Sequence, residues 1–537
     1  MESNYYNSLG EYVAALEAAG KLVRIKEPVN KDTEMHPLVR LQFRGLEEKD
    51  RKAFYFENVV DGAGRKYGIP VVLCAMAGSR DIYGLGLKCP PEQIPDRWAA
   101  ARARPIAPRI VESGPVHDVV HTGAQLEQAG LDSLPVPIST PGFDNAPYIS
   151  AGHWVSKDPD TGIHNLGNYR GMVKSKTRLG CFSGSSEQGI GIHARKWKKL
   201  GHKSMPAAVV IGVPPSVSYT SVSRVPYDMC EYDVAGGLAG RPLELVRCKT
   251  VDLLVPAQSE IVIEGNISLE MLEMEGPFAE FTGFMAKRDY SYFMDVSCIT
   301  SKKKPIYAAF LSQFPPSESS KLRRIARENA MRRCLLEAGM DNVLDVHQVE
   351  AAGSWGVTLI KIRRRSDADG QRVFDALVPA GHLGKVAIVV DEDIDIYDPL
   401  TVYWALAFRM QPHRDVKVVN NYRNVLDPSI VDCAADRNAV KVEDEPPSSL
   451  LCIDATRDWN YPPIALPNRE TMENAVALWE KLGLGNRVGE LKLREPWCGY
   501  DLGYWSEEDR AEARLALEGR YFETGEKQRS SQRRPLD

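Results

Sequence analysis

The chain has 537 residues, a formal net charge of −5 and ten cysteines. This length predicts two or three lobes, and the slight negative charge excludes a general electrostatic attraction to nucleic acid or to an anionic membrane. The sequence has no C-x-x-C pair, no apolar run long enough to span a membrane and no signal peptide, so we expect a cytoplasmic protein with free thiols.

The N-terminal half begins with a predicted helix, because Ser8 opens an S-x-x-E capping pattern followed by apolar residues on one face. A strand is expected directly after it, at residues 22–25. From about residue 119 to 300, short β-like runs such as residues 207–213 and 260–267 alternate with Gly/Pro turns. This alternation predicts a mainly β domain.

The C-terminal half begins with a long helix over residues 319–339, which has a serine-rich start, apolar residues four apart and a glycine stop. A second α/β lobe follows. Its predicted strands and helix lie at residues 343–362, 386–390 and 400–410. Further helices are expected at residues 469–482 and after Ser506, and the polar, basic stretch at residues 525–537 predicts a frayed tail.

A set of polar residues within the predicted β domain describes one site. They are Asn165 and Arg170 in HNLGNYR, then His193 and Glu231, and finally Glu275 and Glu280 in EGPFAE. The two carboxylates of EGPFAE flank a Gly-Pro turn and cannot lie on a regular helix, so a loop can aim both into a pocket. An arginine that pairs with one carboxylate leaves the other free to have a raised pKa and donate a proton.

Three of these residues have the chemistry of metal ligands. Asn165, His193 and Glu231 offer an amide oxygen, an imidazole and a carboxylate, which suit Mn²⁺ or Mg²⁺ better than structural zinc. Spacing alone leaves two alternatives open. A lone histidine is more often structural, and Glu231 with Arg170 can form a simple surface ion pair.

The segments that carry these residues resemble the UbiD family of reversible, non-oxidative decarboxylases, which use prenylated FMN. The matching segments are NLGNYR, IHARKWKKLG, MPAAVVIGVPP, CEYDVAG and EGPFAEFTG, and the likeness covers roughly residues 8–455. The resemblance implies an α/β (α+β) chain with a mainly β split-barrel cofactor domain. It also implies that a long helix joins this domain to a C-terminal α/β oligomerisation domain.

We accordingly expect four regions in chain order. They are an N-terminal region with the cofactor domain at residues 1–318, a connecting helix at residues 319–340, the oligomerisation domain at residues 341–465, and C-terminal helices with a polar tail at residues 466–537.

The resemblance also implies a role for each matched residue. Arg170, Glu275 and Glu280 would be the catalytic group, and Asn165, His193 and Glu231 would hold a divalent metal at the cofactor phosphate. The remaining residues implied to bind prenylated FMN are Leu166, Gly167, Asn168, Tyr169, Ile192 and Lys385, together with Arg170. Ser221 and Ser223 fall where relatives place a K⁺ site, although Val222 and Arg224 depart from the family pattern.

The implied activity is reversible decarboxylation of an aromatic or α,β-unsaturated carboxylic acid. Arg170 and Glu275 would position the carboxylate, and Glu280 would protonate the carbon that loses CO₂. Two alternatives stay open: an aryl-carboxyl CoA thioester as substrate, or a non-catalytic flavin-binding subunit of a larger decarboxylase. The family also implies a homo-oligomer, dimeric or hexameric, and a flavin prenyltransferase that supplies the cofactor.

Overall fold

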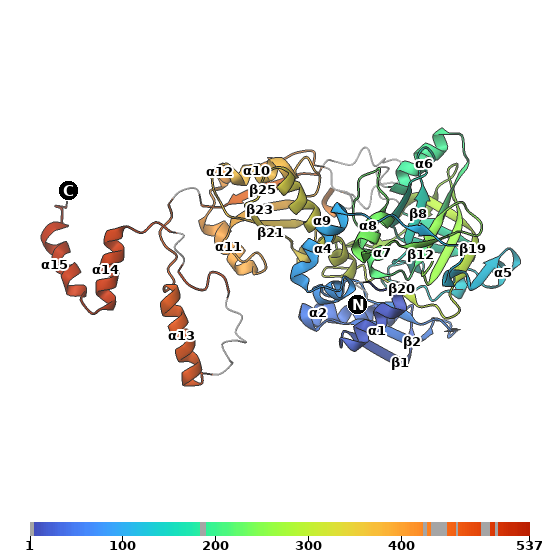
Figure 1. The fold of residues 1–537 in the computed structure, drawn as a ribbon, viewed down its shortest axis with the longest axis horizontal. Helices are drawn as coiled ribbons and strands as arrows, with labels where there is room; N and C mark the ends of the chain where they lie inside the picture. The colour runs from blue at the N-terminus through green and yellow to red at the C-terminus, as the bar shows by residue number, and fades with distance from the viewer. Residues whose placement is uncertain are drawn as a thin grey trace.

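The structure is a computed structural model that describes residues 5–182, 189–422, 427–430, 448–457, 460–484, 494–499 and 503–536. It is a mixed α/β fold with several sheets (Figure 1). A small N-terminal sheet and a large ten-stranded sheet lie on one side, and a C-terminal sheet follows them. A helical arm extends away from the C-terminal sheet.

The N-terminal sheet is covered by helix α1 (Leu9–Ala18), which confirms the first prediction. The Ser8 side chain accepts the Glu11 N–H at 3.2 Å, and Leu9, Tyr12, Val13 and Leu16 are buried on one face. The sheet has the order β1-β2-β4-β20, with β3 on the side of β2. Its strands are β1 (Leu22–Asn30), β2 (Ala53–Val60), β3 (Lys66–Tyr67), β4 (Val71–Leu73) and β20 (Tyr307–Ala309), and the helices that follow α1 are α2 (Met35–Gly45), α3 (Arg80–Gly86) and α4 (Ile94–Ala103).

The ten-stranded sheet forms the mainly β part of the chain. Its path is β7-β10-β11-β19-β15-β12-β8-β9, and β6 and β16 also pair with β19. The strands are β6 (Val119–Thr122), β7 (Tyr148–Ile149), β8 (His153–Lys157), β9 (His164–Asn168), β10 (Gly171–Ser175), β11 (Arg178–Cys181), β12 (Ser204–Ile211), β15 (Ile261–Ser268), β16 (Glu273–Glu275) and β19 (Asp289–Ser301). The predicted strands at residues 207–213 and 260–267 correspond to β12 and β15, which pair antiparallel. In the described residues the path is open, because its end strands β7 and β9 do not pair with each other.

Shorter elements surround this sheet. The helices are α5 (Ala124–Gln128), α6 (Gly189–Lys199), α7 (Pro215–Thr220) and α8 (Glu231–Ala239). The strands are β5 (Arg109–Ile110), β13 (Glu244–Arg247), β14 (Leu254–Pro256), β17 (Phe278–Ala279) and β18 (Met285–Ala286).

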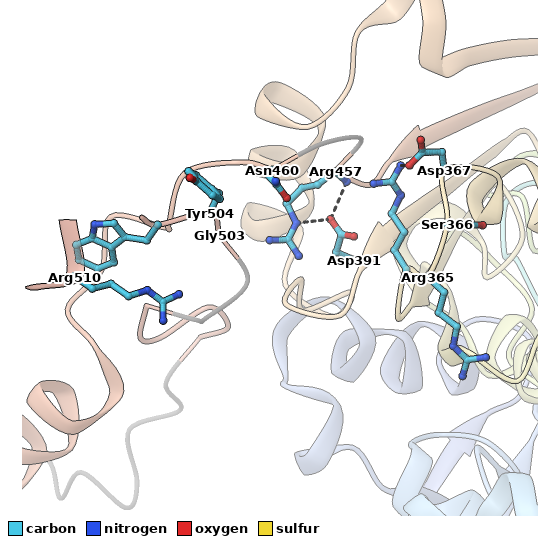
Figure 2. Close-up of a pocket in the computed structure, with 11 residues that line it drawn as sticks. Arg365, Ser366, Asp367, Asp391, Arg457, Asn460, Gly503, Tyr504 and Arg510 are labelled. Atoms are coloured by element: carbon cyan, nitrogen blue, oxygen red, sulfur yellow. Dashed lines mark hydrogen bonds and ion pairs between the residues drawn. The ribbon is translucent and has the colours of Figure 1, made fainter. Parts of the chain in front are cut away.

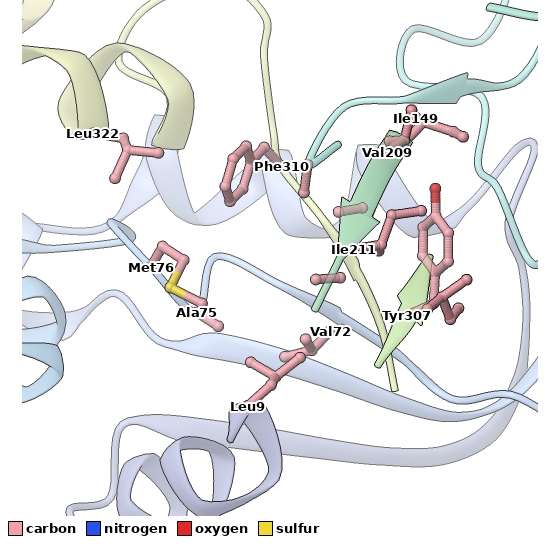
Figure 3. Close-up of a cluster of buried hydrophobic side chains, with 14 of the residues drawn as sticks. Leu9, Val72, Ala75, Met76, Ile149, Val209, Ile211, Tyr307, Phe310 and Leu322 are labelled. Carbon is pink, nitrogen blue, oxygen red and sulfur yellow. The ribbon is translucent and has the colours of Figure 1, made fainter. Parts of the chain in front are cut away.

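One hydrophobic core joins the N-terminal sheet to the large sheet. Figure 3 shows Leu9 of α1 and Val72 of β4 in the same cluster as Ile211 of β12 and Tyr307 of β20. Leu322 of α9 (Glu318–Glu337) belongs to it as well. Because these residues come from distant parts of the chain, the core fixes the large sheet against the N-terminal region.

Helix α9 is the predicted long helix. Ser317 and Ser320 form a capping box at its start. The Lys321 side chain is fully buried, and its ammonium lies 2.6 Å from the Glu48 carboxylate and 2.9 Å from the Glu350 carboxylate. Two carboxylates around one buried ammonium compensate its charge, so the helix is tied to the segments before and after it.

The C-terminal sheet has the order β21-β22-β23-β25-β24, with parallel pairs in its centre. Its strands are β21 (Val343–Gln348), β22 (Val357–Ile362), β23 (Val386–Asp391), β24 (Val416–Val419) and β25 (Leu450–Ala455), and its helices are α10 (Asp369–Leu377), α11 (Pro399–Phe408) and α12 (Pro412–Asp415). The predicted strands and helix of the second lobe are therefore confirmed.

The arm consists of α13 (Arg469–Leu482), α14 (Glu507–Leu517) and α15 (Tyr521–Ser531), none of which has a buried residue. The frayed tail predicted from residue 525 was wrong, because α15 continues to Ser531. Lys527 forms ion pairs with Glu508 and Glu512 of α14, so the two helices support each other. Within the described ranges, no helix combines the length and apolar character needed to cross a bilayer.

Candidate active site

A buried arginine holds two carboxylates at the edge of the large sheet. Arg170 lies between β9 and β10, and its Nε and Nη2 donate to the two oxygens of Glu275 at 2.9 and 2.5 Å. Its Nη1 donates to Glu280 Oε1 at 2.6 Å. The side chains of Arg170, Glu275 and Glu280 are 5%, 1% and 13% exposed. One planar guanidinium therefore binds one carboxylate through two bonds and the other through one.

The EGPFAE segment places both carboxylates as the sequence predicted, from a turn rather than a helix. Glu275 ends β16, where it pairs with Asp289 of β19. Gly276 follows with φ +94, and a Cβ there would lie 2.9 Å from the Lys287 carbonyl oxygen, so only glycine fits. Strand β17 then brings Glu280 back to the same guanidinium.

Burial and neighbouring charges affect the pKa values of Glu280 and Arg170 in different ways. Burial raises the pKa of the Glu280 carboxyl above its usual value, although the Arg170 and Arg323 charges oppose this. Burial of Arg170 favours its neutral form, but the charges of Glu280 and Glu275 outweigh this effect and raise the pKa of the guanidinium. Arg170 therefore stays charged, while Glu280 holds a proton more readily than an exposed glutamate does.

Aromatic residues enclose this group, and two of them, Phe182 and Tyr148, were not singled out from the sequence. The Arg170 guanidinium carbon lies 4.0 Å from the Phe182 ring centroid and 5.3 Å from that of Phe278. The Tyr148 ring packs on Phe278 at 4.6 Å, and its hydroxyl donates to the Pro277 carbonyl at 3.3 Å. No local pattern identifies Phe182 or Tyr148, because each reaches the site through strand pairing.

The predicted metal ligands converge from three elements. The Glu231 carboxylate, at the start of α8, accepts the Leu166 N–H at 2.8 Å and the Asn165 Nδ2 at 3.1 Å. His193 of α6 is oriented by Ser156 of β8, whose Oγ lies 2.8 Å from His193 Nδ1. Among the described residues no hydrogen bond is formed by the other ring nitrogen of His193, so it can bind a ligand.

The chemistry of these donors fits a divalent ion. The Asn165 Oδ1 is buried and has no hydrogen-bond partner in the described structure, which is the state of an oxygen that awaits a ligand. Burial lowers the pKa of His193 to about 4, so its imidazole is neutral and able to bind a metal. No group of three His, Cys, Asp or Glu that could hold a metal occurs in the described ranges. This agrees with a donor set whose third member is an amide.

Gly189, the first residue of α6, permits this arrangement. A Cβ at this position would lie 1.6 Å from Asn165 Oδ1. The helix that carries His193 can therefore approach the Asn165 side chain only because residue 189 has no side chain.

Most of the other predicted cofactor residues lie near the metal ligands in β9 and α6. Leu166 and Gly167 are buried in β9, Asn168 and Tyr169 are half-buried after them, and Ile192 is half-buried beside His193. The Asn168 N–H donates to the Ser221 carbonyl at 3.2 Å.

Both serines of the suggested K⁺ site are buried. The Ser221 Oγ lies 2.9 Å from His153 Nδ1, and the Ser223 Oγ donates to the Tyr219 carbonyl at 3.3 Å. Lys385 stands apart, because its ammonium binds Asp427 at 2.7 Å and Ser429 at 2.9 Å. In the described structure no hydrogen bond joins Lys385 to the other predicted cofactor residues.

A separate hollow of about 430 Å³ lies between the C-terminal sheet and residues 503–510 of the arm (Figure 2). Asp391 and Arg457 face each other in it with a separation of 3.2 Å, and Tyr504 and Arg510 approach from the arm. It shares no lining residue with the site around Arg170.

Comparison with known proteins decides the family. Three domain profiles match in order: the 3-octaprenyl-4-hydroxybenzoate carboxy-lyase N-terminal domain at residues 13–102, its Rift-related domain at residues 109–314 and its C-terminal domain at residues 324–437. The chain belongs to the UbiD family. The UbiD domains cover most of the chain, and its fold matches solved UbiD-class structures in three domains.

Several UbiD-class structures resemble this chain over almost their whole length. An evolved dimeric form of the enzyme HmfF from Pelotomaculum thermopropionicum, in complex with prFMN, is 30% identical, with a TM-score of 0.73 over 87% of this chain and 98% of that one. The closed form of vanillic acid decarboxylase from Sedimentibacter hydroxybenzoicus is 27% identical, with a TM-score of 0.75 over 89% and 99%. An uncharacterised protein of Archaeoglobus fulgidus is 27% identical over 499 residues, which are 89% of this chain and 98% of that protein.

Proposed function

We propose that this protein is a prenylated-FMN-dependent carboxy-lyase that reversibly decarboxylates an aromatic or α,β-unsaturated carboxylic acid. The observation that carries the proposal is the buried Arg170, which holds Glu275 through two bonds and Glu280 through one. Family membership supports the reaction class, because relatives that include a named vanillic acid decarboxylase share the fold.

Each side chain of this group has a defined task. Arg170 binds the substrate carboxylate through its planar donors, and Glu275 keeps the guanidinium oriented through two hydrogen bonds. Glu280 gives its proton to the carbon that loses CO₂. A carboxyl group with a raised pKa is suited to this step, since it carries a proton at a pH at which an exposed glutamate is ionised.

Asn165, His193 and Glu231 would hold Mn²⁺ or Mg²⁺ at the cofactor phosphate, with a K⁺ ion near Ser221 and Ser223. The backbone of residues 166–169 and the Ile192 side chain would contact the flavin. When bound, prenylated FMN accepts the electron pair that departing CO₂ leaves on the substrate. The protein's part is to hold the acid, exclude water and deliver the proton.

The assembly follows from the same proposal. Residues 1–318 would contain the cofactor domain, residues 319–340 the connecting helix and residues 341–465 the domain through which identical chains associate, with residues 466–537 as an appended arm. A flavin prenyltransferase would supply the cofactor. The ten cysteines without C-x-x-C spacing support a reducing compartment, which we propose is the cytoplasm.

The test is turnover of a panel of aromatic and cinnamic-type acids by flavin-loaded protein in D₂O, with the product analysed for deuterium at the vacated carbon. Glu280→Gln should lower the rate by about 10²–10⁴-fold while bound flavin is retained. Glu273→Gln is the matched control, because Glu273 lies two residues from Glu275 on β16 but pairs with Lys174 and Arg178. Full activity of Glu280→Gln would refute Glu280 as the proton donor. Turnover that requires further subunits and is unchanged in the complete system with Glu280→Gln would instead favour a non-catalytic flavin-binding subunit.

A further inference from the structure

Three arginines near the carboxylate group form no ion pair with a carboxylate of the described residues. Helix α9 presents Arg323 and Arg327 four residues apart, and therefore on one face. Arg323 packs against the residue that follows Glu280, with its guanidinium carbon 3.8 Å from the Phe281 ring centroid. Arg224 directly follows Ser223, and its positive charge helps to lower the pKa of both Arg323 and Arg327.

The pattern on α9 shows how unusual this face is. Two other arginines of the helix have a glutamate four residues on, and both pairs are formed: Arg324 with Glu328 at 3.5 Å and Arg333 with Glu337 at 3.4 Å. Arg323 instead has Arg327 at that position. Like charges at this spacing destabilise a helix because they repel each other. An anion bound between the two guanidinium groups would remove this repulsion.

Partial burial of the two arginines strengthens the repulsion between them. Arg323 and Arg327 are each half-buried, and no carboxylate of the described residues forms an ion pair with Arg224, Arg323 or Arg327. Burial and the neighbouring positive charges lower the pKa of Arg327 to about 9 and that of Arg323 to about 10. A partly desolvated cluster of cations is expected to bind an anion.

The position of the cluster indicates which anion it binds. Arg323 packs against Phe281, the residue after Glu280, and its charge helps to lower the pKa of Glu280. The charged residues that most affect the pKa of His193 are different ones, namely Asp158 and Lys196. Arg323 thus lies at the Glu280 end of the site, where the substrate would lie, and Arg327 follows it on the same helix face.

We propose that Arg224, Arg323 and Arg327 bind a second carboxylate of the substrate, remote from the one held by Arg170. The preferred substrates are then ring dicarboxylates. This rests on the proposed function for the identity of the reacting group, but the binding itself is independent of turnover.

The test compares equilibrium binding of matched dianions and monoanions to flavin-loaded protein that carries Glu280→Gln to prevent turnover. The probes are phthalate, isophthalate and terephthalate, each with its monomethyl ester. At least one diacid should bind about tenfold or more tightly than its ester. Combined replacement Arg323→Gln/Arg327→Gln should reduce this preference to less than about threefold, and Arg323→Lys/Arg327→Lys should retain most of it.

Arg333→Gln is the control, because Arg333 is an exposed arginine of the same helix. It should leave the preference unchanged. A preference that survives Arg323→Gln/Arg327→Gln, or its absence in all three pairs, would overturn the proposal. Loss of flavin from Arg323→Gln/Arg327→Gln would also overturn it, since the cluster would then hold the cofactor phosphate. If a diacid binds more tightly than its ester but the enzyme with Glu280 never decarboxylates it, the proposed reaction would be refuted. The proposed carboxylate-binding site would still be supported.

Discussion

Replacement of Arg170 by methionine removes the positive charge at the centre of the candidate site while keeping most of the side-chain volume. The wild-type guanidinium makes three hydrogen bonds of 2.5–2.9 Å to two carboxylates. Glu275 is 1% exposed and Glu280 is 13% exposed, so water cannot replace these bonds without rearrangement. Arg170→Met therefore leaves two neighbouring carboxyl groups without their common partner.

Removal of one partner of a buried ion pair lowers the free energy of unfolding by about 3–5 kcal/mol, because the remaining charge is uncompensated. For a domain of roughly 200 residues, each kcal/mol corresponds to a shift of about 2–4 °C in Tm, which predicts a decrease of about 6–20 °C. The second replacement Glu275→Gln in the Arg170→Met background should recover part of this loss. The two substitutions are thus expected to be strongly non-additive.

The pH dependence has a definite sign. Without Arg170, a charge that opposes the effect of burial on Glu280 is lost, so the pKa of Glu280 rises further and the folded state binds its proton more tightly than the unfolded state. The deficit of Arg170→Met should then be large at pH 7 to 8 and shrink toward pH 5. Apparent unfolding midpoints by circular dichroism, measured at each pH for all four members of the cycle, give the result. A shift below about 2 °C at pH 7.5, or simple additivity, would refute the buried ion-pair arrangement.

Three further predictions concern single residues. Burial raises the pKa of the Glu280 carboxyl, and the proton donor is lost as pH rises through that pKa. Initial-rate profiles should therefore show that kcat/KM falls on the alkaline side. A rise of kcat/KM there would contradict the assignment of Glu280 as proton donor. Gly189→Ala should displace Asn165 and reduce bound metal and flavin severalfold by elemental analysis and absorbance, whereas Gly45→Ala, which meets no atom within 4 Å, should not. Glu318→Gln should destabilise the fold by about 1–3 kcal/mol in urea titration, because the fully buried carboxylate accepts four backbone N–H groups and an amide would leave at least one unpaired; an unchanged midpoint would argue against that network.

Local sequence signals were sufficient for many elements. Ser8 and Ser506 cap helices where the capping pattern predicted them, and the α9 boundaries agree with residues 319–339 to within two residues. These features depend on neighbouring residues, so a pattern in the chain can indicate them. The turn of EGPFAE is similar, since glycine and proline exclude a helix there.

Features that depend on distant contacts could not be predicted in this way. Phe182 reaches Arg170 because β10 and β11 pair, and Lys385 is held by Asp427, forty-two residues later. The helical end of the arm was missed because its stabilising ion pairs join Lys527 to a preceding helix. Likewise, the spacing of Arg323 and Arg327 shows that they share a helix face, but only the fold places Glu280 beside them.

The central claim is that this chain binds prenylated FMN through Asn165, His193 and Glu231. The most direct measurement is an absorbance spectrum and mass spectrum of the small molecules released from protein co-expressed with a flavin prenyltransferase. An Asn165→Ala/Glu231→Ala variant serves as the control. Prenylated FMN should be present in the parent and lost from the folded control. A well-folded parent that carries no flavin would contradict the account.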